Sequence, residues 1–96
     1  MEELFAVIDV RSLNEVKMTP LQTTNENCLL YNIPTNNIPN NVNNIEEMSK
    51  KKMVYIICAS GMRANMVKTN YFLQNENIVS IGGVSNADLK KYYLKL

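Results

Sequence analysis

The chain has 96 residues, of which 46% are hydrophobic and 20% charged, so residues 1–96 can form one compact domain but not two. Ten Lys and Arg against nine Asp and Glu leave a net charge of +1, too weak a field to attract nucleic acid or anionic lipid. Histidine is absent, which removes the commonest general base and the commonest transition-metal ligand. The sequence therefore predicts no metal site.

The two cysteines, Cys28 and Cys58, are too few for a disulfide framework and lack Cys-x-x-Cys spacing. We expect both thiols to be reduced and the protein to be cytoplasmic. The acidic start, residues 1–3, lacks the positive charge of a secretory signal. The longest apolar run, residues 53–59, is far shorter than the roughly 20 residues that a membrane helix requires, so no membrane association is predicted.

Four apolar runs predict strands, and helical patterns lie between them. The predicted strands cover residues 4–8, which lead into Asp9, then 28–33, 53–58 and 78–81, which Gly82 and Gly83 follow. The predicted helices cover residues 12–17, 45–51, 62–75 and 86–94. Strands that alternate with helices indicate an α/β fold with a central, mainly parallel sheet of four to five strands flanked by helices.

An asparagine-rich segment interrupts this alternation. Residues 32–44 contain seven Asn and two of the three Pro. Asn and Pro favour turns over helices and central strands. We therefore expect an ordered surface loop there and assign no function to it.

The longest helical pattern, residues 62–75, is predicted to bury one stripe of side chains. Apolar residues recur there at helical spacing: Met66, Tyr71 or Phe72, and Leu73. A face of this kind packs against the core of a domain.

The segment from Tyr55 to Ala64 contains the candidate catalytic residues. An apolar strand brings Cys58 to its C-terminal end, and a loop of small residues leads from there into a helix. Parallel sheets bind ligands at this edge, and a loop before a helix can turn its N–H groups toward one anion. Such a cradle would stabilise a Cys58 thiolate, with Gly61 permitting a tight turn and Arg63 adding positive charge. The nucleophile would then need no histidine.

The alternative is a purely structural cysteine, because a thiol at the end of a buried strand is commonly an inert small hydrophobe. The small residues, the glycine and the arginine that follow Cys58 favour a functional role for it. Cys28 has no cationic residue closer in sequence than Lys17, and it is predicted to belong to the core.

The string from Cys58 to Ala64, which follows a predicted strand, resembles the active-site loop of rhodanese-like sulfurtransferase domains. The pattern of that family is Cys-x-x-Gly-x-Arg followed by a small residue. Three further segments agree with the family in order and approximate spacing: Asp9-Val10-Arg11 with Glu15, Asn32-Ile33-Pro34, and Gly82-Gly83. The resemblance covers nearly the whole chain and implies a rhodanese-like three-layer α/β fold.

By this resemblance, Cys58 would take sulfane sulfur from a small donor such as thiosulfate, or from a protein persulfide, and carry it as a persulfide. A thiol or cyanide would then accept the sulfur. The loop residues implied to bind the substrate are Ala59, Ser60, Gly61, Met62 and Arg63. Their N–H groups would hold the persulfide charge, Arg63 would favour a dianionic donor, and no cofactor is implied.

Asp9 and Arg11 are expected to support the site from the end of a neighbouring strand. A structural account of Arg11 is an ion pair with Glu15 that ties this strand to the following helix. We favour the structural account for Arg11.

Two other kinds of protein have a loop similar to this one. Phosphatases of the same fold place five residues between the cysteine and the arginine, whereas four intervene here, which suits a smaller sulfur site. The string Cys-Ala-Ser-Gly-Met also resembles the phosphocysteine loop of sugar phosphotransferase IIB proteins, although there the cysteine lies near the N-terminus, and here 57 residues precede Cys58. A non-catalytic rhodanese-like module that binds a partner or senses oxidants is a further alternative.

The chain departs from the family pattern mainly in its scaffold. Thr19-Pro20-Leu21 stands where the family has Gly-His-Ile, and Ala87 stands where it commonly has Trp. The chain starts eight residues before Asp9, so the N-terminal helix and first short strand of the family are expected to be missing. A homodimer could cover the edge or apolar surface exposed by that loss.

Overall fold

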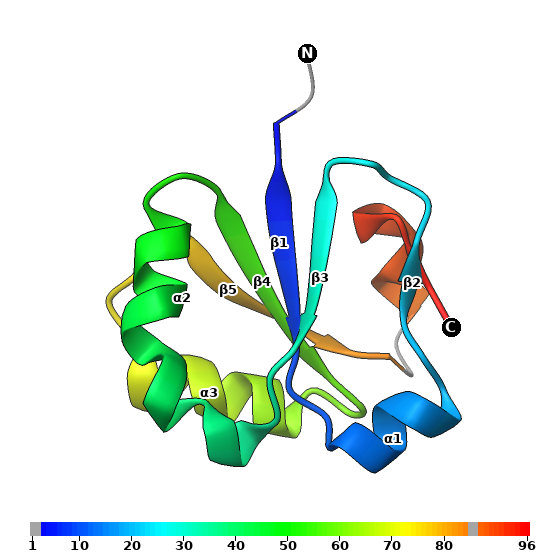
Figure 1. Ribbon diagram of the computed structural model, residues 1–96, viewed down its shortest axis with the longest axis horizontal. Helices are drawn as coiled ribbons and strands as arrows, with labels where there is room; N and C mark the ends of the chain where they lie inside the picture. Colours follow the sequence, from blue (N-terminus) through cyan, green and yellow to red (C-terminus); the bar gives the residue numbers. More distant parts are fainter. Residues whose placement is uncertain (1–2, 85–86) are drawn as a thin grey trace.

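The computed structural model describes residues 3–84 and 87–96, and its central feature is a four-stranded parallel sheet (Figure 1). The strands are β1 (Phe5–Asp9), β3 (Cys28–Asn32), β4 (Met53–Cys58) and β5 (Ile78–Gly83). They lie in the order β3-β1-β4-β5, and neighbouring strands are parallel. The α/β class and all four predicted strands are confirmed.

Three α-helices connect these strands: α1 (Leu13–Met18), α2 (Val42–Ser49) and α3 (Met62–Tyr71). Short 3-10 helices cover Thr35–Asn37, Pro39–Asn41 and Ala87–Tyr92. A separate antiparallel ribbon pairs β2 (Gln22–Thr23) with β6 (Leu94–Lys95). Within the two described ranges, no helix combines the length and the hydrophobicity needed to cross a membrane.

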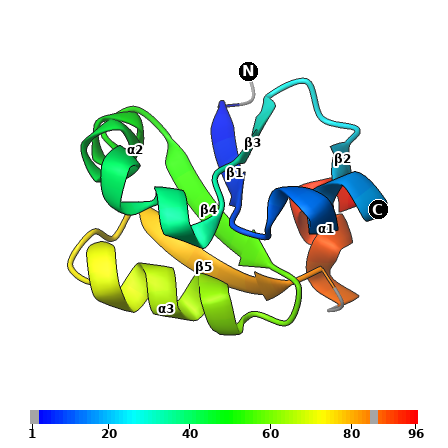
Figure 2. The ribbon, with the colours of Figure 1, turned by 60° about the horizontal axis from the view of Figure 1, so that its bottom comes forward.

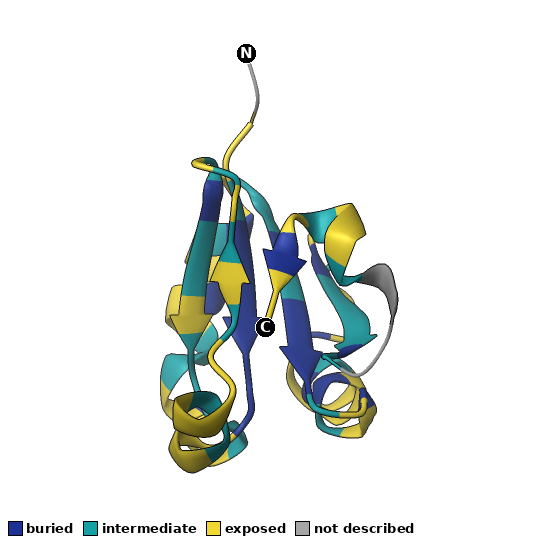
Figure 3. Cartoon of the chain, turned by 90° about the vertical axis from the view of Figure 1, so that its right-hand side faces the viewer, coloured by how far each residue is buried: buried dark blue, intermediate teal, exposed yellow. Residues whose placement is uncertain are grey.

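The sheet is the middle of three layers. Successive strand residues point to opposite faces, so Ala6 and Ile8 of β1 pack in the core cluster beneath α2 and α3, whereas Phe5 and Val7 pack with Leu94 on the other face. In Figure 1, α2 and α3 lie on one side of the sheet and the C-terminal segment on the other. Buried residues follow the strands between these layers (Figure 3).

The asparagine-rich segment is largely helical. Residues 35–41 form two 3-10 helices, and α2 begins at Val42. Pro39 starts the second 3-10 helix, where its fixed φ is favourable and its missing N–H is not needed. Ile38, between the two, is fully buried in the core. The segment lies at the surface as predicted, but the predicted loop conformation is wrong, because composition does not reveal that one apolar side chain anchors the segment.

Helix α3 ends at Tyr71, four residues earlier than predicted. The Lys68 Nζ donates to the carbonyl oxygens of Phe72 and Asn75, at 2.8 and 2.5 Å. Carbonyl groups at a helix end have no partner within the helix, and a basic side chain near the C-terminus can satisfy them. Lys68 therefore stabilises the turn that follows the helix.

The stripe that α3 and its end bury differs from the predicted one. Ala64, Val67 and Phe72 are buried in the core, whereas Met66 and Leu73 are more than half exposed. The prediction is wrong for Met66 because α3 turns the face of Ala64 and Val67 toward the core, and wrong for Leu73 because the helix ends before it, at Tyr71. Of the alternatives Tyr71 and Phe72, Phe72 is the core residue.

The helix predicted over residues 86–94 is replaced by the 3-10 helix Ala87–Tyr92 and strand β6, and Asn86 lies outside the described residues. Tyr93 has φ 61°, a left-handed conformation that turns the chain between the two elements. The buried Leu94 then pairs with Thr23. Strands of two residues are too short to show an alternating pattern, so the sequence did not predict the ribbon.

Candidate functional site

The topology places Cys58 where parallel α/β sheets bind ligands. Strand β1 pairs with β3 on one side and with β4 on the other, so the strand order reverses between β1 and β4. Asp9 ends β1 opposite Ile57, and Cys58 ends β4 one residue further on. Ligands bind outside the carboxyl ends of strands at such a reversal point. Figure 2 shows α1 and α3, the helices that follow β1 and β4, near this edge.

Two backbone N–H groups point at the Cys58 sulfur. The N–H of Gly61 donates to Sγ at 3.0 Å, and the N–H of Ala64 donates to it at 3.4 Å. Gly61 precedes the first residue of α3 with φ 102°, a conformation that side chains disfavour. The sulfur therefore lies at the N-terminal end of a ten-residue helix, where the helix dipole favours negative charge.

The sulfur lies beneath its own loop. Cys58 is 0% exposed and Gly61 is buried, whereas Ala59 is half-buried. Ser60 is exposed, and Met62 is 72% exposed. A reagent can reach the thiol only after this loop moves.

Gly83 allows β5 to approach the Cys58 loop closely. A Cβ at Gly83 would lie 2.6 Å from the carbonyl carbon of Ser60 and would collide with the carbonyl oxygen of Ala59. A Cβ at Gly61 would in turn lie 3.3 Å from the Cα of Gly82. The Gly-Gly motif thus serves backbone packing between the loop and the last strand of the sheet.

Asp9 and Arg11 form a buried ion pair at the end of β1, with 3% and 2% exposure. The Arg11 Nη2 and Nε donate to Asp9 Oδ2 at 2.8 and 3.0 Å. The remaining Arg11 donors reach the hydroxyl and the carbonyl oxygen of Thr19, both at 2.9 Å. The Asn32 amide donates to the backbone carbonyls of Asp9 and Arg11. This network holds the turn between β1 and α1.

The predicted ion pair between Arg11 and Glu15 is wrong. Glu15 instead accepts hydrogen bonds from the Nη1 and Nη2 of Arg63, at 2.6 and 2.8 Å. Glu15 also forms a capping box with Ser12, whose N–H donates to Glu15 Oε1 and whose Oγ accepts from the Glu15 N–H. Since Asp9 already binds Arg11 at the end of β1, the Glu15 carboxylate is left to join α1 to α3.

The pair holds both of its groups in the charged state. The hydrogen bonds from Arg63 lower the pKa of Glu15 from 4.5 to about 2, and the N–H of Ser12 adds to this effect. The hydrogen bond to Glu15 raises the pKa of Arg63, and the charges of Cys58 and Asp9 act in the same direction. Arg63 therefore lies within electrostatic reach of Cys58 while it donates to Glu15.

Cys28 belongs to the core, as predicted. It is 7% exposed and packs with Val7, Ile57 and Leu94. Burial raises the pKa of this thiol, which disfavours the reactive thiolate. Both Cys28 and Cys58 are free thiols.

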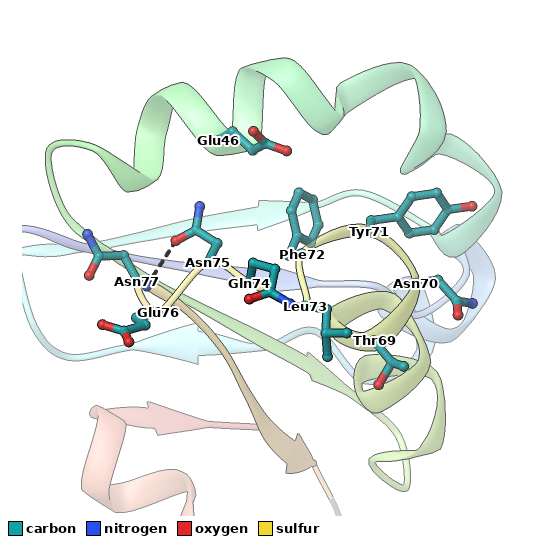
Figure 4. Close-up of a pocket in the computed structure, with 10 residues that line it drawn as sticks. All are labelled: Glu46, Thr69, Asn70, Tyr71, Phe72, Leu73, Gln74, Asn75, Glu76 and Asn77. Atoms are coloured by element: carbon teal, nitrogen blue, oxygen red, sulfur yellow. Dashed lines mark hydrogen bonds between the residues drawn. The ribbon is translucent and has the colours of Figure 1, made fainter.

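A hollow of about 850 Å³ lies at the other end of α3 from Cys58 (Figure 4). It is lined by Glu46 of α2 and by residues 69–77. Its side chains spread along a helix end and a loop, and Asn75 accepts a hydrogen bond from the N–H of Asn77. In the part of the chain that the structure describes, no three Cys, Asp or Glu residues gather to hold a metal ion. We place the candidate site at Cys58.

Sequence reasoning missed two contributors to this site. The N–H of Ala64 lies one residue beyond the loop that was expected to bind the sulfur. Glu15 was assigned to Arg11, although the spacing of Ser12 and Glu15 matches a capping box and could have placed Glu15 in the first turn of a helix. Its pairing with Arg63, 48 residues away, leaves no local signal in the sequence.

The Glu15–Arg63 pair predicts a pH dependence of stability. Because the pKa of Glu15 is lowered from 4.5 to about 2, its charged form stabilises the fold above about pH 4.5, and this stabilisation is lost as the pH falls through 2. Glu15→Gln is therefore expected to lower the urea midpoint of unfolding at pH 7 and to lose this effect toward pH 2. Glu26→Gln, at an exposed carboxylate, is the control. An unchanged gap between wild type and Glu15→Gln from pH 7 to 2 would contradict the assignment.

Comparisons with known proteins give one match. No family model and no curated protein matches the chain. The crystal structure of SSP1007 from Staphylococcus saprophyticus subsp. saprophyticus is similar, with a TM-score of 0.59 and 25% sequence identity. The match covers 88% of this chain and 90% of that chain. The similarity thus extends over nearly the whole domain.

Proposed function

We propose that the protein is a rhodanese-type sulfurtransferase in which Cys58 carries sulfane sulfur as a persulfide. The observation that carries the proposal is the pair of N–H groups, from Gly61 and Ala64, that donate to the Cys58 sulfur at the start of α3. Backbone donors at a helix N-terminus stabilise a thiolate without a histidine base. The resemblance of the Cys58–Ala64 loop to the rhodanese pattern supports the same chemistry.

The reaction proceeds in two displacements. The Cys58 thiolate attacks the outer sulfur of thiosulfate, the S–S bond breaks, and sulfite leaves with the electron pair. A thiolate or cyanide then attacks the outer sulfur of the Cys58 persulfide and restores the Cys58 thiolate. The N–H groups of the loop, residues 59–63, would hold the charge of the terminal sulfur. These steps need no cofactor.

Because Cys58 is buried, sulfur transfer requires the loop to open, and this requirement favours a second candidate function. With Cys58 at 0% exposure, a donor must meet a state in which the loop has opened. If the loop stays closed, the domain is a non-catalytic rhodanese-like module that binds a partner or senses oxidants. The two candidates differ in whether Cys58 accepts sulfur.

Sulfur loading followed by intact mass tests the proposal. After incubation with thiosulfate or cysteine persulfide, the wild type is expected to gain one sulfur, about 32 Da, as a reversible persulfide. Cys58→Ala is expected to gain none. Cys28→Ser is the matched control and is expected to load like the wild type, because Cys28 lies in the core. Wild type that stays unmodified with both donors would overturn the proposal and leave the non-catalytic module.

Both steps require a reduced thiol at Cys58. The structure has both cysteines free, which fits a reducing compartment. We therefore propose a cytoplasmic setting for the activity.

A further inference from the structure

The charges near Cys58 cancel in two pairs. Arg63 donates to both carboxylate oxygens of Glu15, and Arg11 donates to Asp9 in the buried pair. Asp9 ends β1 opposite Ile57, next to Cys58 at the end of β4, and Arg63 follows Cys58 by five residues. The two cations and two carboxylates carry no net charge among themselves.

This cancellation bears on the choice of sulfur donor. Thiosulfate is a dianion, and a dianion is attracted most by a cation whose charge no carboxylate already balances. Each terminal nitrogen of Arg63 donates to a Glu15 oxygen, so the Glu15 carboxylate balances the charge of Arg63. Thiosulfate would have to displace the Glu15 carboxylate or bind beside it, and like charges at close range repel. An organic persulfide, RS–SH, requires no such exchange.

The surface beside Arg63 suits an organic group. A small hollow of about 170 Å³ is lined by Arg63, Met66 and Tyr71, together with Thr35, Val67 and Asn70. Methionine is flexible and polarisable, so it adapts to organic groups of varied shape. An inorganic anion would gain nothing from the apolar side chains of this hollow.

We propose that Glu15 is a positioning residue that holds Arg63 away from the donor, so that the protein takes organic persulfides in preference to thiosulfate. This inference rests on the sulfurtransferase function proposed above. The Cys58 thiolate attacks the outer sulfur of RS–SH, the S–S bond breaks, and RS⁻ leaves with the electron pair. Cys58 then carries S–SH, and no oxidant or reductant is consumed.

The test compares the loading rates of Cys58 with two donors at low concentration, followed by rapid quenching and intact mass. The donors are thiosulfate and cysteine persulfide, whose amino and carboxylate charges cancel. Glu15→Gln removes the charge of Glu15, and a glutamine at this position still completes a capping box with Ser12. The double variant Glu15→Gln/Arg63→Gln removes the freed cation as well.

Wild type is expected to load faster from cysteine persulfide than from thiosulfate. Glu15→Gln should raise the thiosulfate rate relative to the cysteine persulfide rate about tenfold, the effect of one unit charge about 6 Å from a dianion in water. This gain should shrink with added NaCl, because salt screens it, and should vanish in the double variant. A purely structural role for Glu15 would lower both rates together.

The outcomes separate this inference from the proposed function. If wild type prefers thiosulfate, or if Glu15→Gln loads without a change in donor ratio, the specificity role of Glu15 is wrong while the sulfurtransferase stands. If neither donor loads Cys58 in any variant, the proposed function fails, and the inference fails with it.

Discussion

Replacing Arg11 with methionine is expected to destabilise the protein by about 3–5 kcal/mol, because the change leaves a buried carboxylate without its cation. Arg11 is 2% exposed and its guanidinium accounts for three hydrogen bonds to the Asp9 side chain. It also donates twice to Thr19. Small domains are stable by only about 5–15 kcal/mol, so this loss is a large share of the total. Urea unfolding followed by circular dichroism measures it.

Two further variants make the Arg11 prediction specific. The double variant Asp9→Asn/Arg11→Met should regain much of the lost stability, since it removes both buried charges. Lys50→Met removes a cation from an exposed pair with Glu47, whose side chains are 69% and 71% exposed, and should leave the midpoint nearly unchanged. If Arg11→Met unfolds at the same urea concentration as Lys50→Met, the buried pair does not hold the turn.

Replacing Gly83 with alanine is expected to displace the Cys58 loop and to cost about 1–3 kcal/mol of stability, the usual range for an overpacked core site. The added Cβ meets backbone atoms of Ala59 and Ser60, and the backbone cannot rotate away as a flexible side chain would. The displacement should weaken the hydrogen bonds from Gly61 and Ala64 to the sulfur. Amide hydrogen exchange at these two positions is therefore expected to accelerate.

The control for Gly83→Ala is Ser60→Ala, which changes an exposed side chain of the same loop without adding volume. It should leave stability and amide exchange close to the wild type. If Gly83→Ala also leaves the exchange of Gly61 and Ala64 unchanged, the close approach of β5 does not set the geometry of the sulfur site.

The strands of the parallel sheet were predictable because each is a mainly apolar run with a clear end. The run 53–58 matches β4 residue for residue, and the glycines mark the end of β5. Segments that depend on a single tertiary contact were not predictable. The asparagine-rich stretch forms helical turns because Ile38 is buried in the core. The antiparallel ribbon forms because Leu94 pairs with Thr23, which is distant in sequence.

In the candidate site, too, some residues could be predicted from the sequence and others could not. Cys58, Gly61 and Arg63 are close in sequence, so the strand-loop-helix pattern predicts that they share one edge of the sheet. The partner of Arg63 comes from a different helix, and only the folded chain shows that it is Glu15. Likewise, the backbone contact of Gly83 with Ser60 explains a motif that the sequence could only match by resemblance.

The antiparallel ribbon has a consequence for the order of folding. Pairing Thr23 with Leu94 closes a loop that contains three of the four parallel strands, β3, β4 and β5. Closing so long a loop costs more chain entropy than forming the neighbouring strand and helix units, so contacts of this range tend to form late. The face that contains Val7 and Cys28 is therefore expected to stay open in folding intermediates after the α2 and α3 face has closed. During refolding, the Cys28 thiol should therefore still react with alkylating reagents after the face covered by α2 and α3 has become protected from solvent.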